Sequence, residues 1–234
     1  MYKRVLLKLS GKQLAGKFES GIDADFVSWL GKEIKKVIDT GCQVVIMVGG
    51  GNYARGAQLA GHSISRVTAD NIGMLGTMMN ALAVADIFNN ESVLARALTN
   101  IKADQVADQF THRRAISELA KGNVVIVAGG IGRPYLTTDT AAVSLALELD
   151  CEVVLKATKV DGVYDKDPAN FSDAIKLDKV SFQQAVEDSN IKVMDKAAMG
   201  LAMEHNLSII VFEAVQPDNI YKAINGEQIG SIIS

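Results

Sequence analysis

Three glycine-rich turns, each placed directly after an apolar run typical of a β-strand, constrain this chain most strongly. They are Lys8-Leu9-Ser10-Gly11, Gly49-Gly50-Gly51-Asn52 and Gly129-Gly130-Ile131-Gly132. Turns with little or no side chain let backbone N–H groups approach an anion closely, and the N-terminus of a following helix adds positive potential. One such turn carries little weight, but three of them predict a crevice built for more than one phosphate group.

The apolar runs alternate with segments of helical periodicity. Strands are predicted at 4–9, 42–48, 92–98, 123–128, 151–157 and 208–213. Because these Val/Ile/Leu runs lack polar alternation, they are typical of strands buried on both faces of a parallel sheet. Helices are predicted from Asp23, as N-cap, to Gly41, and at 69–88, 113–121, 139–149, 181–188, 195–205 and 217–225. The alternation predicts an α/β fold, a three-layer α/β/α sandwich with a mainly parallel central sheet.

The chain is predicted to form a single domain over 1–234, with one break in the pattern at 158–179. Asp161-Gly162 is a hairpin signal there, and Asp167-Pro168 is a turn signal. We interpret this segment as an excursion from the sheet that separates two lobes, roughly 1–150 and 151–234. In parallel sheets ligands bind beyond the carboxyl ends of the strands, which is where the glycine turns are expected.

Composition argues against several function classes. With 24 Lys and Arg against 27 Asp and Glu, the 234 residues carry a formal charge of −3 at pH 7, which does not suggest a general binder of nucleic acid or membrane surfaces. No N-terminal signal pattern is seen, and no run approaches the roughly 20 apolar residues that span a bilayer. Cys42 and Cys151 open apolar runs and are expected to be free, buried thiols. We expect a soluble, cytoplasmic protein.

Missing motifs narrow the chemistry further. The sequence has no Gly-x-x-x-x-Gly-Lys-Ser/Thr, and no Gly-x-Gly-x-x-Gly follows its first strand. A P-loop enzyme and a dinucleotide-binding fold are therefore disfavoured. His62, His112 and His205 lack the spacing of a metal site or a hydrolase triad. We expect no metal site made by protein side chains.

Charged residues near the glycine turns are the candidate functional groups. Lys8 lies inside an apolar run, where a lysine is costly unless its ammonium reaches water or an anion. Arg55 follows the second turn, and its planar fork suits phosphate. Asp139 follows the third turn, where Thr137 or Thr138 can also cap the alanine-rich helix. Each of these residues could instead have a structural role without a ligand. Lys8 would then be an edge-strand lysine, Arg55 a surface arginine and Asp139 a helix-capping carboxylate.

Together these motifs make the chain resemble the bacterial uridylate (UMP) kinases of the amino-acid-kinase family over essentially its whole length. The most specific segments are Gly49-Gly50-Gly51-Asn52 with Arg55-Gly56, Asp70 with Met74-Leu75 and Asn80-Ala81-Leu82, Arg113-Arg114-Ala115-Ile116, 137–142, 156–164 and Val193-Met194-Asp195. The resemblance implies transfer of the γ-phosphoryl group of ATP to UMP, giving UDP and ADP in pyrimidine nucleotide synthesis. It also implies Mg²⁺ carried with ATP, a homohexamer, activation by GTP and inhibition by UTP.

The resemblance implies the site residues as well. Phosphoryl transfer needs charge neutralised on the moving group, and this role is assigned to Lys8 and Arg55. Asp139 would orient Lys8 or the metal, and Asp195 and Lys156 are further candidates for the same catalytic network. ATP would bind on the 151–234 side, together with Lys8, Leu9, Ser10, Gly11, Gly51, Arg55, Thr158, Tyr164 and Asp167. UMP would bind on the 1–150 side, with Gly50, Asp70, Ile131, Gly132, Arg133, Pro134, Tyr135, Leu136, Thr137 and Thr138. The chain departs from the family pattern of Glu, Thr, Asn and Phe at Lys12, Ile131, Arg133 and Leu136.

Two alternatives stay open from the sequence. Another enzyme of the same family would phosphorylate a small carboxylate such as N-acetylglutamate, although Asp70 and the Thr137-Thr138-Asp139 run favour a nucleotide acceptor. A nucleotide sensor without catalytic activity would use the same scaffold. Such a binder has no need of the whole set of catalytic candidates.

Overall fold

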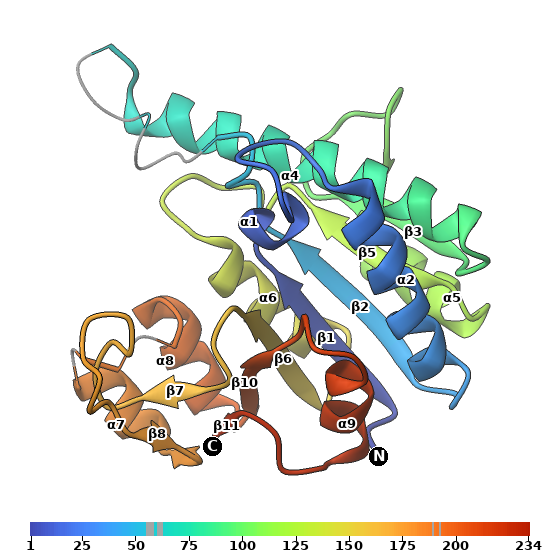
Figure 1. Cartoon of the computed structure of the whole chain (residues 1–234). Helices are drawn as coiled ribbons and strands as arrows, with labels where there is room; N and C mark the ends of the chain where they lie inside the picture. Colours follow the sequence, from blue (N-terminus) through green and yellow to red (C-terminus); the bar gives the residue numbers. More distant parts are fainter. Residues whose placement is uncertain (55–58, 60–62, 189, 192) are drawn as a thin grey trace.

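The structure is organised around one large sheet with helices on both faces (Figure 1). It is a computed structural model that describes residues 1–54, 59, 63–188, 190–191 and 193–234. Within these residues the sheet has the strand order β4-β3-β5-β2-β1-β6-β10-β11-β9. Its strands are β1 (Arg4–Leu9), β2 (Gln43–Val48), β3 (Ala95–Thr99), β4 (Asp108–Gln109), β5 (Val124–Ala128), β6 (Val153–Thr158), β9 (Lys179–Val180), β10 (Ile209–Glu213) and β11 (Ser231–Ile233). Every neighbouring pair is parallel except β10 with β11.

Two apolar cores separate the sheet from its two helical layers. Along β1 the side chains alternate, so that Leu7 is buried in one core and Leu6 in the other. One layer contains α1 (Gly11–Leu14), α2 (Ala24–Ile38), α4 (Arg66–Asn90) and α9 (Asn219–Asn225). The opposite layer contains α5 (His112–Ala120), α6 (Thr138–Glu148), α7 (Phe182–Glu187) and α8 (Lys196–Glu204). The prediction of a three-layer sandwich with a mainly parallel sheet is confirmed.

Short polar side chains set where α2 and α4 begin. Asp23 caps α2 as predicted, its side chain accepting a hydrogen bond from the Phe26 backbone N–H. Ser65 does the same for α4, accepting from Thr68 N. This cap lies ahead of the first strongly apolar position, and for that reason α4 begins three residues before the predicted helix at 69–88.

Three local expectations need correction. Gly11 does not lie in an open turn but begins the short helix α1, because Ser10 and Gln13 form a reciprocal capping box. Asp161-Gly162 is not the turn of the hairpin. These residues precede β7 (Val163–Tyr164), which pairs with β8 (Lys176–Leu177) across the longer loop that contains Asp167-Pro168. The strands β4, β9 and β11, of two or three residues each, are absent from the sequence-based prediction because they are too short to show a period.

Both cysteines are buried and free, as predicted. Cys42 directly precedes β2, and burial raises the pKa of its thiol to about 11. Burial likewise raises the pKa of the Cys151 thiol to about 12. Both thiols are therefore protonated at neutral pH, so they act as small apolar groups rather than as nucleophiles.

Helix α4 is long and apolar enough to fit a membrane span by length and composition alone. No segment of this kind was expected from the sequence. Half of the most apolar window of α4 is buried inside the fold, where Met78, Val84 and Phe88 belong to the core on its side of the sheet. Core helices commonly pass the same test. The burial accounts for the apolar character of this helix.

The glycine turn after β2 packs directly against α4. A Cβ placed on Gly50 would lie 2.4 Å from the Gly73 carbonyl oxygen and 2.9 Å from Thr77 N, both of which are backbone atoms of α4. Real Cβ atoms do not approach so closely. The absence of a side chain at Gly50 is thus what allows the helix to lie on the turn.

We expect Gly50→Ala to lower the free energy of unfolding by about 1–3 kcal/mol, because the helix backbone must move away from the new methyl group. The matched control is Gly200→Ala in α8, where a Cβ meets nothing within 4 Å. That change should be neutral or stabilise by up to about 1 kcal/mol. Urea unfolding of both variants checks the contrast, and equal stabilities would contradict the packing described.

Candidate active site

The carboxyl ends of four central strands, β1, β2, β5 and β6, lie side by side along one border of the sheet, which we call the edge. In register, Leu9 of β1 lies beside Val48 of β2, and Lys8 of β1 lies beside Lys156 of β6. The second and third glycine turns follow β2 and β5 at this same edge. The edge therefore has the position at which parallel sheets bind ligands.

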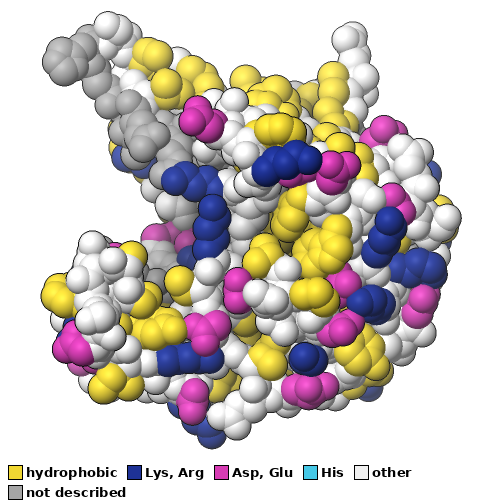
Figure 2. All heavy atoms as spheres, in the orientation of Figure 1, with side chains coloured by type: hydrophobic (Ala, Val, Ile, Leu, Met, Phe, Trp, Pro, Cys, Tyr) yellow, Lys and Arg dark blue, Asp and Glu magenta, His cyan; other side chains and the backbone are white. Residues whose placement is uncertain are grey.

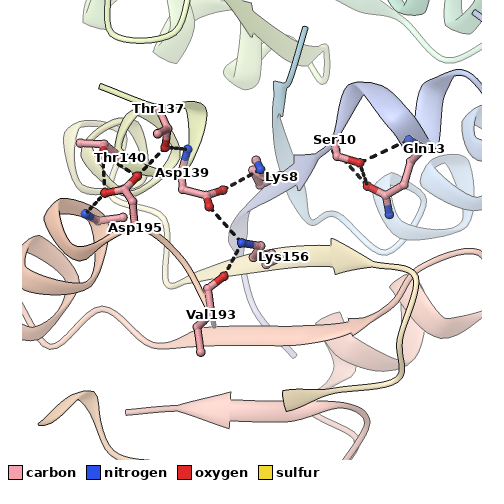
Figure 3. A network of polar contacts seen from close by, with 10 residues as sticks. Lys8, Ser10, Gln13, Thr137, Asp139, Thr140, Lys156, Val193 and Asp195 are labelled. Carbon is pink, nitrogen blue, oxygen red and sulfur yellow. Dashed lines mark hydrogen bonds and ion pairs between the residues drawn. The ribbon is translucent and has the colours of Figure 1, made fainter. Parts of the chain in front are cut away.

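Lys8 and Lys156 share one carboxylate beneath this edge. They are direct neighbours on parallel strands, so both side chains point to the same face, toward Asp139 in α6 (Figure 3). Lys8 Nζ lies 2.6 Å from Asp139 Oδ1, as an ion pair rather than an aligned hydrogen bond. Lys156 Nζ lies 3.0 Å from Oδ2 and donates a hydrogen bond to it. The side chains of all three are between 11% and 16% exposed.

The charges in this cluster are set by burial and by each other. Burial alone would raise the pKa of Asp139, but the neighbouring ammonium groups of Lys8 and Lys156 outweigh it and hold the pKa below the usual aspartate value. Burial lowers the pKa of the Lys156 ammonium, and the attraction of Asp139 opposes that change. Asp139 is therefore a carboxylate at neutral pH and is not suited to act as a general acid.

Asp195 holds the N-terminal ends of two helices together. It is the N-cap of α8, its Oδ1 accepting from Ala198 N at 2.9 Å. The same carboxylate accepts hydrogen bonds from the hydroxyls of Thr137 and Thr140 at the start of α6 (Figure 3). Thr137 in turn is the N-cap of α6. Asp195 thus contacts the helix that carries Asp139 and makes no ion pair with Lys8.

The second glycine turn is fixed by two buried asparagines. Asn80 of α4 donates to the Gly49 carbonyl at 2.6 Å, and its side chain exchanges hydrogen bonds with that of Asn52. Gly11 lies against this turn, since a Cβ there would approach Gly51 N to 2.6 Å. The first two glycine turns therefore meet backbone to backbone, and this brings the ends of β1 and β2 together.

The third glycine turn is held by its neighbours in a conformation that favours glycine. Gly129, Gly130 and Gly132 all have positive φ, at 80°, 54° and 72°. Thr77 Oγ1 accepts a hydrogen bond from Gly129 N at 2.7 Å, and Asn100 donates to the Gly130 carbonyl at 2.6 Å. The turn is thereby tied to α4 and to the end of β3.

Residues 131–138 continue from this turn to α6 and contact the N-terminal part of α4. Asp70 Oδ2 accepts a hydrogen bond from Tyr135 N at 2.8 Å, and the Arg66 Nε lies 2.8–2.9 Å from both oxygens of the same carboxylate. The Arg66 guanidinium also lies over the Tyr135 ring, 5.3 Å from its centroid. Two segments predicted to bind the same ligand, Asp70 and 131–138, are therefore in contact.

On the other side of the edge, the β7–β8 hairpin and its loop form a cavity of about 480 Å³. Tyr164 and Asp167 line it together with Phe171. Tyr164 donates its hydroxyl to Asp161, and Asp167 caps the loop by accepting from Ala169 N. Thr158, at the end of β6, lies beside Gln13 of α1, whose side chain donates to its carbonyl. The space-filling view shows the molecule hollowed between the hairpin side and the α4 side, with Lys and Arg side chains along the hollow (Figure 2).

Arg55 lies outside the residues that the structure describes, so its place in the site is a prediction from the sequence. Leu9 is buried at the end of β1, and Ser10 caps α1. Tyr135 and Leu136 are exposed, at 64% and 42%. Among the described residues, no group of three or more His, Cys, Asp and Glu side chains is placed to hold a metal ion.

Sequence reasoning missed or underweighted several residues of the site. Lys156, like Lys8, is a lysine within an apolar strand run. This pattern alone therefore indicates both lysines equally as candidate functional residues. Asn52 and Asn80 are 28 positions apart, and their pairing is visible in the fold alone. Arg66 lies four positions before Asp70, the spacing of an ion pair on one helix face.

Known proteins share this fold over 98% or more of the chain. The structure of UMP kinase from Bacillus anthracis superposes with a TM-score of 0.94 at 36% identity, covering 100% of this chain and 96% of that one. UMP kinase from Ureaplasma parvum gives 0.92 at 32% identity, covering 100% and 99%. Uridylate kinase from Archaeoglobus fulgidus gives 0.74 at 29% identity, covering 98% and 99%.

The family comparison agrees with these structures. Residues 3–213 match the family described as the amino acid kinase family. The resemblance inferred from the glycine turns and the charged residues that follow them is confirmed by both comparisons. The chain belongs to the amino acid kinase family.

Proposed function

We propose that this protein is a UMP kinase, which transfers the γ-phosphoryl group of ATP to UMP and yields UDP and ADP. The observation that carries the proposal is the Lys8–Asp139 ion pair at the glycine-lined edge of the sheet, in a chain that aligns end to end with UMP kinases. Phosphoryl transfer requires two polyanions held in line and neutralisation of charge on the moving group. A buried ammonium beside closely packed backbone amides is suited to both tasks.

ATP is assigned to the side of the edge formed by the first glycine turn and the hairpin. The phosphates would lie over Lys8, Leu9, Ser10, Gly11, Gly51 and Arg55, and the nucleoside would lie toward Thr158, Tyr164 and Asp167. The cavity beside Tyr164 and Asp167 supports this placement, because its lining combines an aromatic ring with a carboxylate. Residues 151–234 thus supply the nucleoside part of the ATP site.

UMP is assigned to the side formed by residues of 1–150. Asp70 would accept hydrogen bonds from the ribose, and Gly50 with Ile131, Gly132, Arg133, Pro134, Tyr135, Leu136, Thr137 and Thr138 would surround the phosphate and base. The Asp70–Tyr135 hydrogen bond supports this assignment, because it joins the two parts of the proposed pocket.

In the mechanism, Lys8 stabilises negative charge on the phosphoryl group as it moves between the two nucleotides. Asp139 orients the Lys8 ammonium and does not need to act as a base, since the attacking phosphate oxygen of UMP is already ionised. Arg55 is proposed to add a second cation from the segment after the second glycine turn. Asp195 acts through the Thr137 and Thr140 hydroxyls, which fix the start of α6 and hence Asp139.

Mg²⁺ enters this scheme as part of the substrate, bound by the phosphates of ATP. It would neutralise charge on the β- and γ-phosphates when it is bound. Asp139 is engaged by two lysines, and Asp195 accepts from two hydroxyls and a backbone N–H. With Mg²⁺ held by ATP, Asp139 continues to orient Lys8 and Asp195 continues to fix the start of α6.

We further propose that the protein forms a homo-oligomer, a hexamer by its resemblance to the family, that GTP activates and UTP inhibits it, and that it works in the cytoplasm in pyrimidine nucleotide synthesis. One face of α4 supports a subunit contact, because Val67, Leu75 and Met79 are 43%, 52% and 46% exposed. Hydrophobic side chains gather over α4 along the upper edge of Figure 2. Exposed apolar faces of this kind commonly mark interfaces.

The proposed reaction is tested by ADP release with UMP, CMP and N-acetylglutamate as acceptors in parallel. We expect UMP to be the preferred acceptor, because Asp70 and the 131–138 loop provide a pocket for ribose and base. Including CMP matters because Arg133 and Leu136 depart from the usual family residues at the acceptor loop. ADP release with N-acetylglutamate and not with UMP would replace the proposal by the alternative, and ATP binding without turnover on any acceptor would indicate a sensor.

Lys8→Ala should lower kcat by about 100-fold or more while leaving the fold intact. Removing one preorganised donor from such a site raises the barrier by about 2.7–4 kcal/mol. The control is Lys35→Ala, which removes a lysine from an exposed ion pair with Asp39 on α2. Steady-state kinetics and far-UV circular dichroism check the two variants. Turnover like that of the wild type in Lys8→Ala would remove Lys8 from the mechanism.

The depressed pKa of Asp139 predicts a pH dependence of stability. A carboxylate whose pKa is lower in the folded state stabilises that state above the unfolded pKa, about 3.9, and the contribution is lost as pH falls through the folded value. The stability advantage of wild type over Asp139→Asn should therefore not shrink between about pH 8 and 5 and should shrink below about pH 4. Urea unfolding at stepped pH measures it, and a difference that already shrinks near pH 6 would contradict the sign.

A further inference from the structure

Lys156 is a second buried lysine at the same carboxylate, and the ion pair by itself does not require it. One lysine suffices to neutralise Asp139, and Lys8 already contacts Oδ1 at 2.6 Å. Lys156 is nevertheless held in β6 with its ammonium on Oδ2 and on the carbonyl oxygen of Val193 (Figure 3). Two ammonium groups beside one carboxylate give the buried cluster a net charge of +1.

This arrangement carries an energetic cost that a purely structural contact would avoid. Bringing two cations together out of water is unfavourable unless the surrounding groups or an arriving anion compensate. The lowered pKa of Lys156 is a sign of that cost. If Lys8 and Asp139 stood alone, the carboxylate would cancel the lysine charge just where the phosphoryl group needs it.

We propose that Lys156 is a positioning residue for phosphoryl transfer: it holds Asp139 Oδ2 so that Oδ1 faces Lys8, and it supplies the charge that balances Asp139, leaving that of Lys8 for the phosphoryl group. This inference rests on the proposed kinase function. Lys156 acts through Asp139 and Lys8, and no contact between Lys156 and either nucleotide is required.

The first test compares Lys156→Met, which keeps the approximate length of the side chain but removes its charge, with the exposed control Lys35→Met. We expect Lys156→Met to lower kcat by about 10- to 100-fold while KM for UMP stays nearly unchanged, because transition-state stabilisation is lost and binding is not. Lys156→Arg, which keeps the charge, should retain more activity than Lys156→Gln. Equal losses in the Arg and Gln variants, or an unchanged kcat in Lys156→Met, would overturn the proposal.

The second test separates positioning from a structural tie to Val193. If Lys156 works through Asp139, adding Lys156→Met to Asp139→Asn should lower kcat little further, whereas a purely structural hydrogen bond to the Val193 carbonyl predicts that the two losses multiply. The double variant is compared with each single variant under saturating ATP and UMP. Multiplying losses would overturn the proposal.

A third measurement does not depend on activity, so it distinguishes failure of this inference from failure of the proposed function. Without Lys156, Asp139 keeps one cation instead of two, so its pKa rises. Because the unfolded pKa of Asp139 is unchanged, the acid loss of stability that this carboxylate causes should be smaller in Lys156→Met than in wild type and should end at a higher pH, as followed by urea unfolding at stepped pH. An acid profile that coincides with that of wild type would show that Lys156 does not govern the charge of Asp139, and the inference would fall even if UMP is phosphorylated.

Discussion

A shared carboxylate between two parallel strands is the interaction on which the rest of this molecule depends. Lys8 and Lys156 can reach Asp139 because β1 and β6 are neighbours in register and α6 lies across both. Such a buried cluster is stable while all its members are present, since removing the carboxylate would leave two unpaired cations. The central strands are therefore held in one relative position by charge as well as by backbone hydrogen bonds and apolar packing.

The surrounding elements are arranged to keep that cluster and the edge above it rigid. Asp195 joins the starts of α6 and α8, and the Asn52–Asn80 pair fixes the turn after β2 against α4. Gly50 has no side chain, so the backbone of that turn packs directly against the backbone of α4. Backbone amides near the edge are thus fixed in position by contacts within the protein, which is the condition for electrostatic catalysis without reorganisation.

Much of the fold follows from the sequence because its central strands are mostly apolar runs of five or six residues that alternate with helices. The Asp23 cap and the order of strands and helices were predictable on that basis. Strands of two or three residues could not be predicted, since their pairing depends on the rest of the sheet. In the site, Lys8 and Asp139 each carried a local signal, but only the fold shows that the two side chains pair. The Asn52–Asn80 contact had no local signal at all, because tertiary packing alone brings α4 to the turn.

The pairing of β1 with β6 has a consequence for how the chain can be divided. Although the nucleotide assignments fall on either side of residue 150, the first strand of the chain is sandwiched between β2 and β6, and the sheet runs through without interruption. A fragment ending near residue 150 would expose one edge of β1 and leave Asp139 without its partner from β6. The residues on the two sides of position 150 therefore share one sheet, and cutting the chain there would separate Lys156 from both Lys8 and Asp139.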